Sequence, residues 1–435
     1  MSDFPQKYPR TAPAQVPDAR ELVVMLLEQW MAGRAYADQL LHEALARETL
    51  PDSRDRALAT DLFYGVLRYL RLLDFLLAPL IRRELEPRVR NALRLGLYQL
   101  LFTRVPPHAA VDSAVNCAGH GRKLVNAVLR GMLRDWPEVE RARDQASPEV
   151  RQSHPDFLIK RWRNQLTAEE LQAFLEWNNR PAEAWVRLNT LKAKNFADLP
   201  ETEVERLEED SVFTHPLFRV ARAGLPWKAL AEGLVYIQDP STSVSCELLA
   251  PQPGETVLDA CAAPGGKSTY MAALMQGKGR LVCTESDGSR LDLLGENLRR
   301  LGAGFAEVRQ VAWGTETEAP ADLGEFDAVL ADVPCTNTGV LRRRVDARWR
   351  LEPREFAQMA ETQLGILKEL AVHVRPGGGR LVYSTCSVDP QENVDLVAAF
   401  LGSPAGEDFR LAEEKSTLPW RDGIDGAYAA LLVRR

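Results

Sequence analysis

Residues 255–275 read ETVLDACAAPGGKSTYMAALM, in which an apolar strand, a glycine turn and the start of a helix follow one another without a gap. After the turn, Met271, Leu274 and Met275 repeat at helical spacing. Two glycines behind a parallel strand let the backbone approach a ligand closely. The next helix then offers free N–H groups and the positive end of its dipole. The stretch therefore predicts a nucleotide-type pocket.

The turn matches neither the dinucleotide motif GxGxxG nor the GK[ST] spacing of a phosphate-binding loop. An adenosine ligand without a polyphosphate fits better, and a plain strand–turn–helix crossover is the alternative for this segment taken alone. Glu285 ends the next expected strand, about twenty residues after the turn, where a carboxylate can hydrogen-bond ribose hydroxyls. An exposed acidic strand end is the alternative, and the spacing favours the ribose.

Strand and helix patterns alternate from Gly233 to the end of the chain. The expected strands span residues 256–258, 280–284, 326–331, 380–384 and 428–433, and the helices between them include residues 290–301 and 356–374. This alternation predicts a mainly parallel sheet with helices on both faces, which binds ligands at the carboxyl ends of its strands. We expect an α/β Rossmann-like domain over residues 233–435.

The first third of the chain has a different pattern. Leucine and valine recur at helical spacing across residues 18–143, and prolines punctuate the connections. We expect an all-α bundle at residues 18–145, preceded by a flexible arm at 1–17 and followed by a small α+β connector at 146–232. Within the connector, the acidic residues 201–210 are typical of a solvated helix.

The chain of 435 residues is 45% hydrophobic and 26% charged, which is ordinary for a soluble protein of two or three domains. It lacks an apolar run of about 18 residues, so no membrane span is expected, and residues 1–17 do not resemble a secretory signal. The six cysteines show neither CxxC pairs nor zinc spacing, so we expect no metal site and a reduced, cytoplasmic setting. The net charge of −7 argues against indiscriminate coating of nucleic acid.

Two clusters of arginines interrupt this acidic average. The first comprises Arg82, Arg83, Arg88, Arg90 and Arg94. A solvated face and an RNA contact explain it equally well. The second comprises Arg342, Arg343, Arg344, Arg348, Arg350 and Arg354. It lies beside the expected active site, which favours a nucleic-acid role.

Two further strand ends carry cysteines, because Cys335 closely follows Asp332 after one strand and Cys386 follows another. A buried cysteine is usually a small apolar residue. Here turn residues and an aspartate at the catalytic edge of a sheet favour reactive thiols. A regulatory disulfide is a less favoured alternative in a reduced compartment.

An adenosine-type pocket beside a thiol suits methylation of a pyrimidine at C5. That carbon becomes nucleophilic only when a thiolate adds to C6, and it then takes a methyl group from a sulfonium donor. Removal of the C5 proton afterwards releases the enzyme. The target base must leave its stack, so we expect a single-stranded or flipped nucleotide.

Three motifs, DACAAPGGKST, DVPCTNTGVLRRR and YSTCSVDPQEN, resemble the signatures of the Sun family of RNA (cytosine-5) methyltransferases. GVLRYLRLLDFLL from Gly65, GLYQLLFTRVPPHAAVDSAV from Gly96 and KLVNAVLRGML from Lys123 resemble the NusB-like RNA-binding domain. From about residue 18 to 435 the chain is similar to the RsmB/Sun-type 16S rRNA (cytosine-C5) methyltransferases of bacteria. The resemblance implies S-adenosylmethionine as the methyl donor, 16S rRNA rather than DNA as the partner, and a cytoplasmic monomer. The helical bundle either positions RNA or only packs against the catalytic part.

The resemblance also implies roles for individual residues. Cys386 would be the nucleophile, Cys335 would assist elimination and product release, and Asp332 would meet the N3/N4 edge of the cytosine. Lys267 would polarise the bound base or keep the thiolate charged. The donor-binding residues would be Cys261, Ala262, Ala263, Pro264, Gly265, Gly266, Lys267, Glu285 and Asp332.

The sequence departs from the family's pattern in three places. The second strand ends in Glu285 where aspartate is usual, and this longer carboxylate still reaches the ribose. The aspartate that commonly supports the adenine is missing around Ala312, where Trp313 offers either stacking on the adenine or ordinary packing. Val333 replaces the usual alanine before Pro334.

Two other functions are compatible with the sequence. The motifs define the reaction better than the substrate, so transfer RNA is an alternative target. A non-catalytic RNA-binding or ribosome assembly factor is the alternative from another class, with the altered segment around Ala312 marking a decayed donor pocket. The presence of both Cys335 and Cys386 argues against this second alternative.

Overall fold

Two compact units make up the chain. The computed structural model describes residues 18–47, 50–195, 198–200, 204, 207–209, 217–221, 224–314 and 321–435. The first unit comprises residues 1–168 with 344–349, and the second comprises residues 169–343 with 350–435. The expected arm at residues 1–17 lies outside the described residues.

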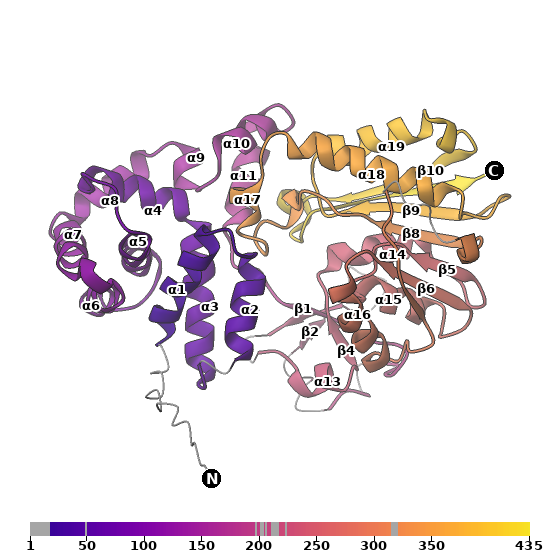
Figure 1. Cartoon of the computed structure of the whole chain (residues 1–435), viewed down its shortest axis with the longest axis horizontal. Helices are drawn as coiled ribbons and strands as arrows, with labels where there is room; N and C mark the ends of the chain where they lie inside the picture. Colours follow the sequence, from indigo (N-terminus) through magenta and orange to yellow (C-terminus); the bar gives the residue numbers. More distant parts are fainter. Residues whose placement is uncertain are drawn as a thin grey trace, which may run out of the picture. The chain divides into compact units, whose positions relative to one another are not determined.

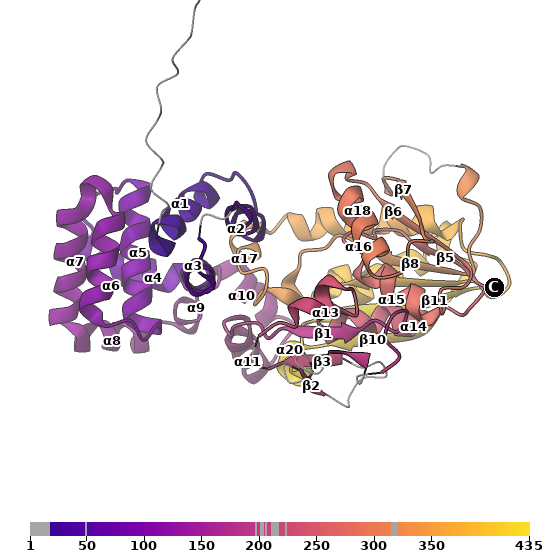
Figure 2. The ribbon, with the colours of Figure 1, turned by 90° about the horizontal axis from the view of Figure 1, so that it is seen from below.

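The first unit is helical throughout its described residues, as the periodicity predicts. Its helices are α1 (Ala19–Met31), α2 (Ala37–Ala46), α3 (Ser53–Arg68), α4 (Leu70–Leu77), α5 (Pro87–Phe102), α6 (Pro107–Cys117), α7 (Arg122–Arg134), α8 (Trp136–Gln145), α9 (Pro148–Arg151) and α10 (Asp156–Arg163). Helices α5, α6 and α7 lie side by side (Figure 2). Their apolar faces form one core, in which Leu62, Leu93 and Leu129 are fully buried.

A short segment from late in the chain, residues 344–349, belongs to this helical unit. The Asp346 carboxylate accepts hydrogen bonds from the Trp30 indole at 3.2 Å and from the backbone N–H of Ala37 at 2.9 Å. The Trp349 indole donates to the carbonyl of Leu67 at 2.8 Å. Buried polar groups of the bundle thereby find partners in a segment about 280 residues or more away in sequence.

Three of the eleven arginines in the two clusters, namely Arg94, Arg342 and Arg348, are buried within the fold. In the first cluster, Arg94 is buried and ion-paired, whereas Arg82 and Arg83 are exposed. In the second cluster, Arg342 and Arg348 are only 3% and 0% exposed. The interpretation of that cluster as an RNA-facing surface is wrong for these two residues, because a buried guanidinium cannot reach a phosphate.

The second unit begins with a four-stranded antiparallel sheet in the order β2-β3-β1-β4. Its strands are β1 (Trp185–Leu188), β2 (Leu207–Glu209), β3 (Leu217–Val220) and β4 (Val235–Ile237), and its helices are α11 (Ala168–Asn178) and α13 (Trp227–Ala231). This arrangement confirms the predicted α+β connector. The helix expected within residues 201–210 is wrong for residues 207–209, because pairing with β3 makes them an edge strand.

A seven-stranded sheet in the order β10-β11-β9-β8-β5-β6-β7 forms the rest of the second unit. Its strands are β5 (Thr256–Asp259), β6 (Arg280–Glu285), β7 (Glu307–Gln310), β8 (Ala328–Asp332), β9 (Arg380–Thr385), β10 (Phe409–Thr417) and β11 (Ala427–Arg434). Pairing from β9 to β7 is parallel, whereas β11 and β10 add in antiparallel fashion. The predicted mainly parallel sheet is confirmed, and β7 and β10 are additional strands.

Helices cover both faces of this sheet (Figure 1). Helices α18 (Glu355–Ala371) and α19 (Val394–Leu401) lie on one face, and α14 (Val244–Leu249), α15 (Gly266–Leu274) and α16 (Gly288–Arg300) lie on the other. An apolar core lies on each face of the sheet, and successive strand residues point into one core and then the other. Leu258 and Val282 pack with α18, whereas Val257 and Leu281 pack with α15. The carboxyl ends of β5, β6, β8 and β9 consequently share one edge. Among the described residues, no helix has both the length and the apolar character that crossing a bilayer requires.

Candidate active site

The glycine turn joins β5 to α15 at the carboxyl edge of the sheet. Gly265 has a φ of +101°, which residues with a Cβ rarely adopt, and it directly precedes the helix. A Cβ on Gly266 would lie 2.8 Å from the ring of Tyr236 and would force it to move. Gly265 is thus required by the backbone conformation, and Gly266 is required by the close packing of Tyr236.

Glu285 ends β6 beside this turn and is only 5% exposed. Its Oε1 accepts hydrogen bonds from the backbone N–H groups of Ser286 and Asp287, at 3.0 Å and 3.2 Å. Its Oε2 lies 3.4 Å from Arg290 Nη1, and Arg290 also donates to the carbonyl of Ala263 at 2.8 Å. These contacts fix the carboxylate in orientation and tie it to the turn.

Lys267 and Asp332 connect the turn to the end of β8. Lys267 Nζ lies 2.6 Å from Asp332 Oδ2, and Ser384 Oγ donates to Asp332 Oδ1 at 2.6 Å. Burial by itself lowers the pKa of Lys267, but the charge of Asp332 and the hydrogen bond to it outweigh burial and raise the pKa above its ordinary value. Lys267 is therefore a cation at neutral pH.

The two cysteines meet at the ends of β8 and β9. The Sγ atoms of Cys335 and Cys386 are 3.0 Å apart, and the two thiols are not bonded to each other. Cys335 is buried, whereas Cys386 is partly exposed. The hydrogen bond with Cys386, followed by burial, raises the pKa of Cys335 well above its ordinary value. Cys335 therefore keeps its proton at neutral pH, and Cys386 is the thiol that a substrate can reach.

A buried glutamate that the sequence analysis missed connects the two cysteine loops. Glu392 is 0% exposed, and its Oε1 accepts a hydrogen bond from the backbone N–H of Thr336 at 2.9 Å. Its Oε2 accepts from Ser387 Oγ at 2.5 Å and from the hydroxyl of Thr336. Thr336 and Ser387 each directly follow a cysteine, so one carboxylate fixes both loops. The only signal in the sequence was its place within YSTCSVDPQEN.

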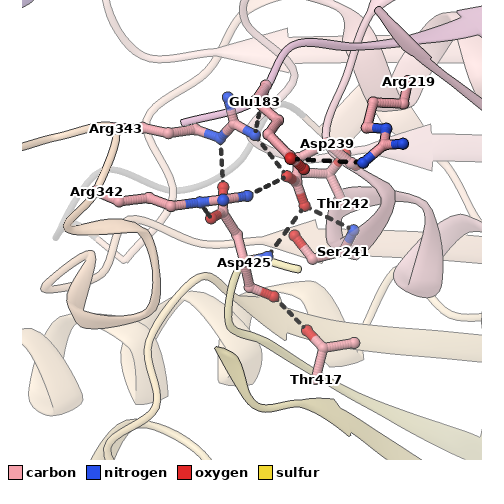
Figure 3. A network of polar contacts seen from close by, with 9 residues as sticks. All are labelled: Glu183, Arg219, Asp239, Ser241, Thr242, Arg342, Arg343, Thr417 and Asp425. Carbon is pink, nitrogen blue, oxygen red and sulfur yellow. Dashed lines mark hydrogen bonds and ion pairs between the residues drawn. The ribbon is translucent and has the colours of Figure 1, made fainter. Parts of the chain in front are cut away.

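Two aspartates hold the arginines that follow the Cys335 loop (Figure 3). Arg342 Nε donates to Asp425 Oδ1 at 2.5 Å, and Arg343 Nη2 donates to Asp239 Oδ2 at 2.7 Å. Arg343 also pairs with Asp425, and Asp239 accepts from the backbone N–H of Ser241 at 3.0 Å. Two cations thus balance two anions, which makes their burial tolerable. The network therefore anchors the segment that begins at Cys335 at its far end, where Arg342 and Arg343 lie.

Arg187 on β1, a second residue that the sequence analysis missed, supports the glycine turn. It is 1% exposed, and its Nη2 donates to Thr269 Oγ1 at 3.2 Å and to the carbonyl of Gly266 at 3.4 Å. Its guanidinium lies 4.5 Å from the centre of the Tyr270 ring. Burial lowers the pKa of Arg187 to about 10, so it stays charged at neutral pH. A lone arginine within the apolar strand WVRL was the available signal.

Two departures from the family's pattern have structural explanations. Trp313 is only 6% exposed, its indole donates to Thr284 Oγ1 at 2.9 Å, and its ring packs edge-on against His373. The side chain therefore belongs to the core, which favours ordinary packing over stacking on an adenine. Val333 is 5% exposed and packs in the same core, so its extra bulk is directed into the protein.

Comparisons with known proteins agree over nearly the whole chain. Residues 246–432 match the family 16S rRNA methyltransferase RsmB/F, residues 17–134 match the NusB family, and residues 154–214 match the ferredoxin-like domain of RsmF/B-like methyltransferases. Ribosomal RNA small subunit methyltransferase B of Klebsiella pneumoniae is 35% identical over 400 residues, which cover 88% of this chain and 91% of that protein. The probable enzyme of the same name from Bacillus subtilis is 34% identical over 404 residues, 88% of each chain. The crystal structure of PH0851 has a TM-score of 0.76 at 25% identity and covers 96% of this chain and 99% of that one.

A mixed seven-stranded sheet with a glycine turn at its carboxyl edge, preceded by a helical NusB region and matched by a 16S rRNA methyltransferase family, defines an S-adenosylmethionine-dependent RNA methyltransferase. The chain belongs to the RsmB/F family of 16S rRNA methyltransferases. Its NusB region, ferredoxin-like connector and methyltransferase domain confirm the three-part fold expected from the sequence.

Proposed function

We propose that this protein transfers a methyl group from S-adenosylmethionine to C5 of a cytosine in 16S rRNA, through a covalent adduct between Cys386 and C6. The observation that carries the proposal is the 3.0 Å approach of the Cys335 and Cys386 sulfur atoms at one edge of the sheet. One thiol is partly exposed and the other is buried and protonated. Addition followed by elimination can use such an unequal pair, with one thiol as nucleophile and the other as a hydrogen-bond donor to the departing sulfur.

The residues of the turn fit an adenosine donor. The left-handed Gly265 directs the chain into the N-terminus of α15 at this edge, and the oriented carboxylate of Glu285 suits ribose hydroxyls. We assign donor binding to Cys261, Ala262, Ala263, Pro264, Gly265, Gly266, Lys267, Glu285 and Asp332. When bound, the donor supplies an electrophilic methyl group.

The remaining chemistry falls to the chain's own residues. The Cys386 thiolate adds to C6 of the cytosine and displaces the electron pair of the C5=C6 bond toward C5 and the ring. Asp332 meets the N3/N4 edge, and the Lys267 cation beside it stabilises the charge that develops there. After methylation, a water molecule takes the C5 proton, the electron pair of the C5–H bond re-forms the C5=C6 bond, and the C6–S bond breaks to release the Cys386 sulfur as a thiolate. Cys335, still protonated, donates a hydrogen bond to that departing sulfur.

We further propose that the protein works in the cytoplasm and that its NusB region contributes to binding 16S rRNA. All six cysteines are free thiols, as a reduced compartment requires. The named relatives are small-subunit ribosomal RNA methyltransferases, which supports that RNA over transfer RNA.

The test is to incubate the protein with labelled S-adenosylmethionine and unmodified 16S rRNA or transfer RNA, followed by nucleoside analysis. We expect label in 5-methylcytosine from 16S rRNA, and a loss of about a thousandfold or more in Cys386→Ala, because the nucleophile is gone. Cys283→Ala is the matched control, since this cysteine lies in the core of the sheet. Label in transfer RNA alone would favour the alternative substrate. No label and no donor binding by calorimetry would favour the non-catalytic factor.

A further inference from the structure

Asn337 lies beside both thiols. Its Oδ1 accepts a hydrogen bond from Cys386 Sγ at 3.2 Å, and its Nδ2 donates to the carbonyl of Cys335 at 2.9 Å. The second bond decides how the amide is turned, because a carbonyl oxygen can only accept and therefore requires Nδ2. An oxygen of fixed orientation thus faces the sulfur of Cys386.

The backbone at Asn337 supports this placement. Its φ of +59° is left-handed, a conformation that residues with a Cβ rarely adopt and that asparagine tolerates better than most. The loop is pinned directly to the second cysteine, since Gly339 N–H donates to the carbonyl of Cys386 at 2.9 Å, and Gly426 N–H donates to the carbonyl of Gly339 at 2.8 Å. An unusual conformation held from several sides is typical of functional loops.

Exposure singles out the same residue. Among residues 335–339, Asn337 is the one that is not buried, and Cys386 is likewise partly exposed. Asn337 and Cys386 are therefore both partly exposed, whereas the residues directly flanking Asn337 are buried. A purely structural asparagine would not need this access.

We propose that Asn337 is a positioning residue that orients the Cys386 sulfur for attack on C6, an inference that rests on the function proposed above. In the resting enzyme the thiol directs its S–H bond at Asn337 Oδ1, which fixes the side-chain torsion of Cys386. On reaction the S–H bond breaks, the proton passes to solvent, and the electron pair left on sulfur forms the S–C6 bond. Asn337 acts through Cys386 and needs no contact of its own with the base.

The variant that tests this role is Asn337→Gly, because glycine adopts a positive φ without strain and removes only the amide. The matched control is Gln276→Gly, since Gln276 is an exposed polar residue with a φ of +55° away from the site. We expect kcat of Asn337→Gly to fall roughly tenfold with KM within about twofold of wild type, because orientation matters to the chemical step. Asn337→Asp should lower kcat further, since a carboxylate would repel the thiolate.

Alkylation of Cys386 by iodoacetamide, followed by peptide mass spectrometry, gives a readout that does not require methylation. A small reagent needs no fixed sulfur orientation, so we expect alkylation in Asn337→Gly to rise about twofold or more while kcat falls. Opposite changes in the two rates distinguish orientation from general damage to the site. Alkylation that is unchanged, or that falls with kcat, overturns the proposal, and so does an unchanged kcat. If the wild type is inactive and alkylation still rises in Asn337→Gly, the proposed function is wrong, but the hydrogen bond between Cys386 and Asn337 is supported.

Discussion

The active site has two halves that are built differently. The donor half, residues 256–274, is one uninterrupted strand, turn and helix. The cysteine half comprises the loops at residues 333–340 and 386–392, which lie about fifty residues apart in sequence and are joined by hydrogen bonds between side chains. Local geometry forms the first half, whereas the second exists only when the sheet has brought β8 and β9 together.

Each half contains one buried carboxyl group, and the two groups differ in the number of hydrogen bonds that they accept. Asp259 ends β5 with one hydrogen bond, from Ser268 Oγ at 2.6 Å, and its Oδ1 has no partner among the described residues. Burial raises the pKa of Asp259 to about 7. Glu392 accepts hydrogen bonds at both oxygens from the loops that it joins, and Gln363 on α18 adds one more. The poorly partnered Asp259 carboxyl can keep its proton, whereas Glu392 acts as a hydrogen-bonded brace between the loops.

The largest effect that separates the two thiols is expected for Cys335→Ala. Addition by Cys386 should continue, but elimination loses the hydrogen bond to the departing sulfur, so turnover should fall about a hundredfold. The expected product is a protein–RNA complex that survives denaturing electrophoresis. Wild type and Cys386→Ala are the controls, and neither should accumulate it. If Cys335→Ala turns over normally, or is inactive without a complex, the role assigned to Cys335 is wrong.

Glu392→Gln tests whether the cysteine half depends on its brace. The amide keeps the shape but offers a donor where Thr336, Ser387 and Gln363 need an acceptor. We expect the free energy of unfolding to fall by about 2–3 kcal/mol, and kcat to fall roughly tenfold as the sulfur atoms lose their fixed separation. Denaturant titration and methylation assays measure the two effects. Glu361→Gln, on the exposed face of α18, should change neither.

An effect that depends on pH, and that leaves the cysteine half unchanged, is expected in the donor half. The pKa of Asp259 rises from 3.8 to about 7 on folding, so the protonated carboxyl favours the fold. This contribution is complete below pH 4 and is lost as the pH rises toward 7, by up to about 1.4 kcal/mol per pH unit. Asp259→Asn cannot ionise, so the stability of the wild type should decline relative to this variant between pH 4 and 7 and run parallel to it above. Denaturant titrations of both proteins across that range would show it, and a constant difference would contradict it.

Two predictions from sequence patterns were wrong: the exposure of two arginines and the helix at a short edge strand. Arg342 and Arg348 carry the charge expected of an RNA-binding surface, yet both are buried, and they donate hydrogen bonds to a carboxylate and a carbonyl far away in sequence. Residues 207–209 have an acidic, helix-like composition and nevertheless form β2, since β3 provides the backbone partners. Composition reports charge and propensity but not the neighbours that decide burial and pairing.

The sequence by itself determined the three-part fold, the glycine turn of the donor half and the two cysteine motifs, because each depends on residues that are adjacent or regularly spaced. Only the tertiary structure decided that Cys335 is buried beside a partly exposed Cys386, that Glu392 joins their loops, and that Asn337 faces the nucleophile. These features arise from contacts across about fifty residues of chain. No local pattern encodes such contacts, since they form when parallel strands align their carboxyl ends at one edge.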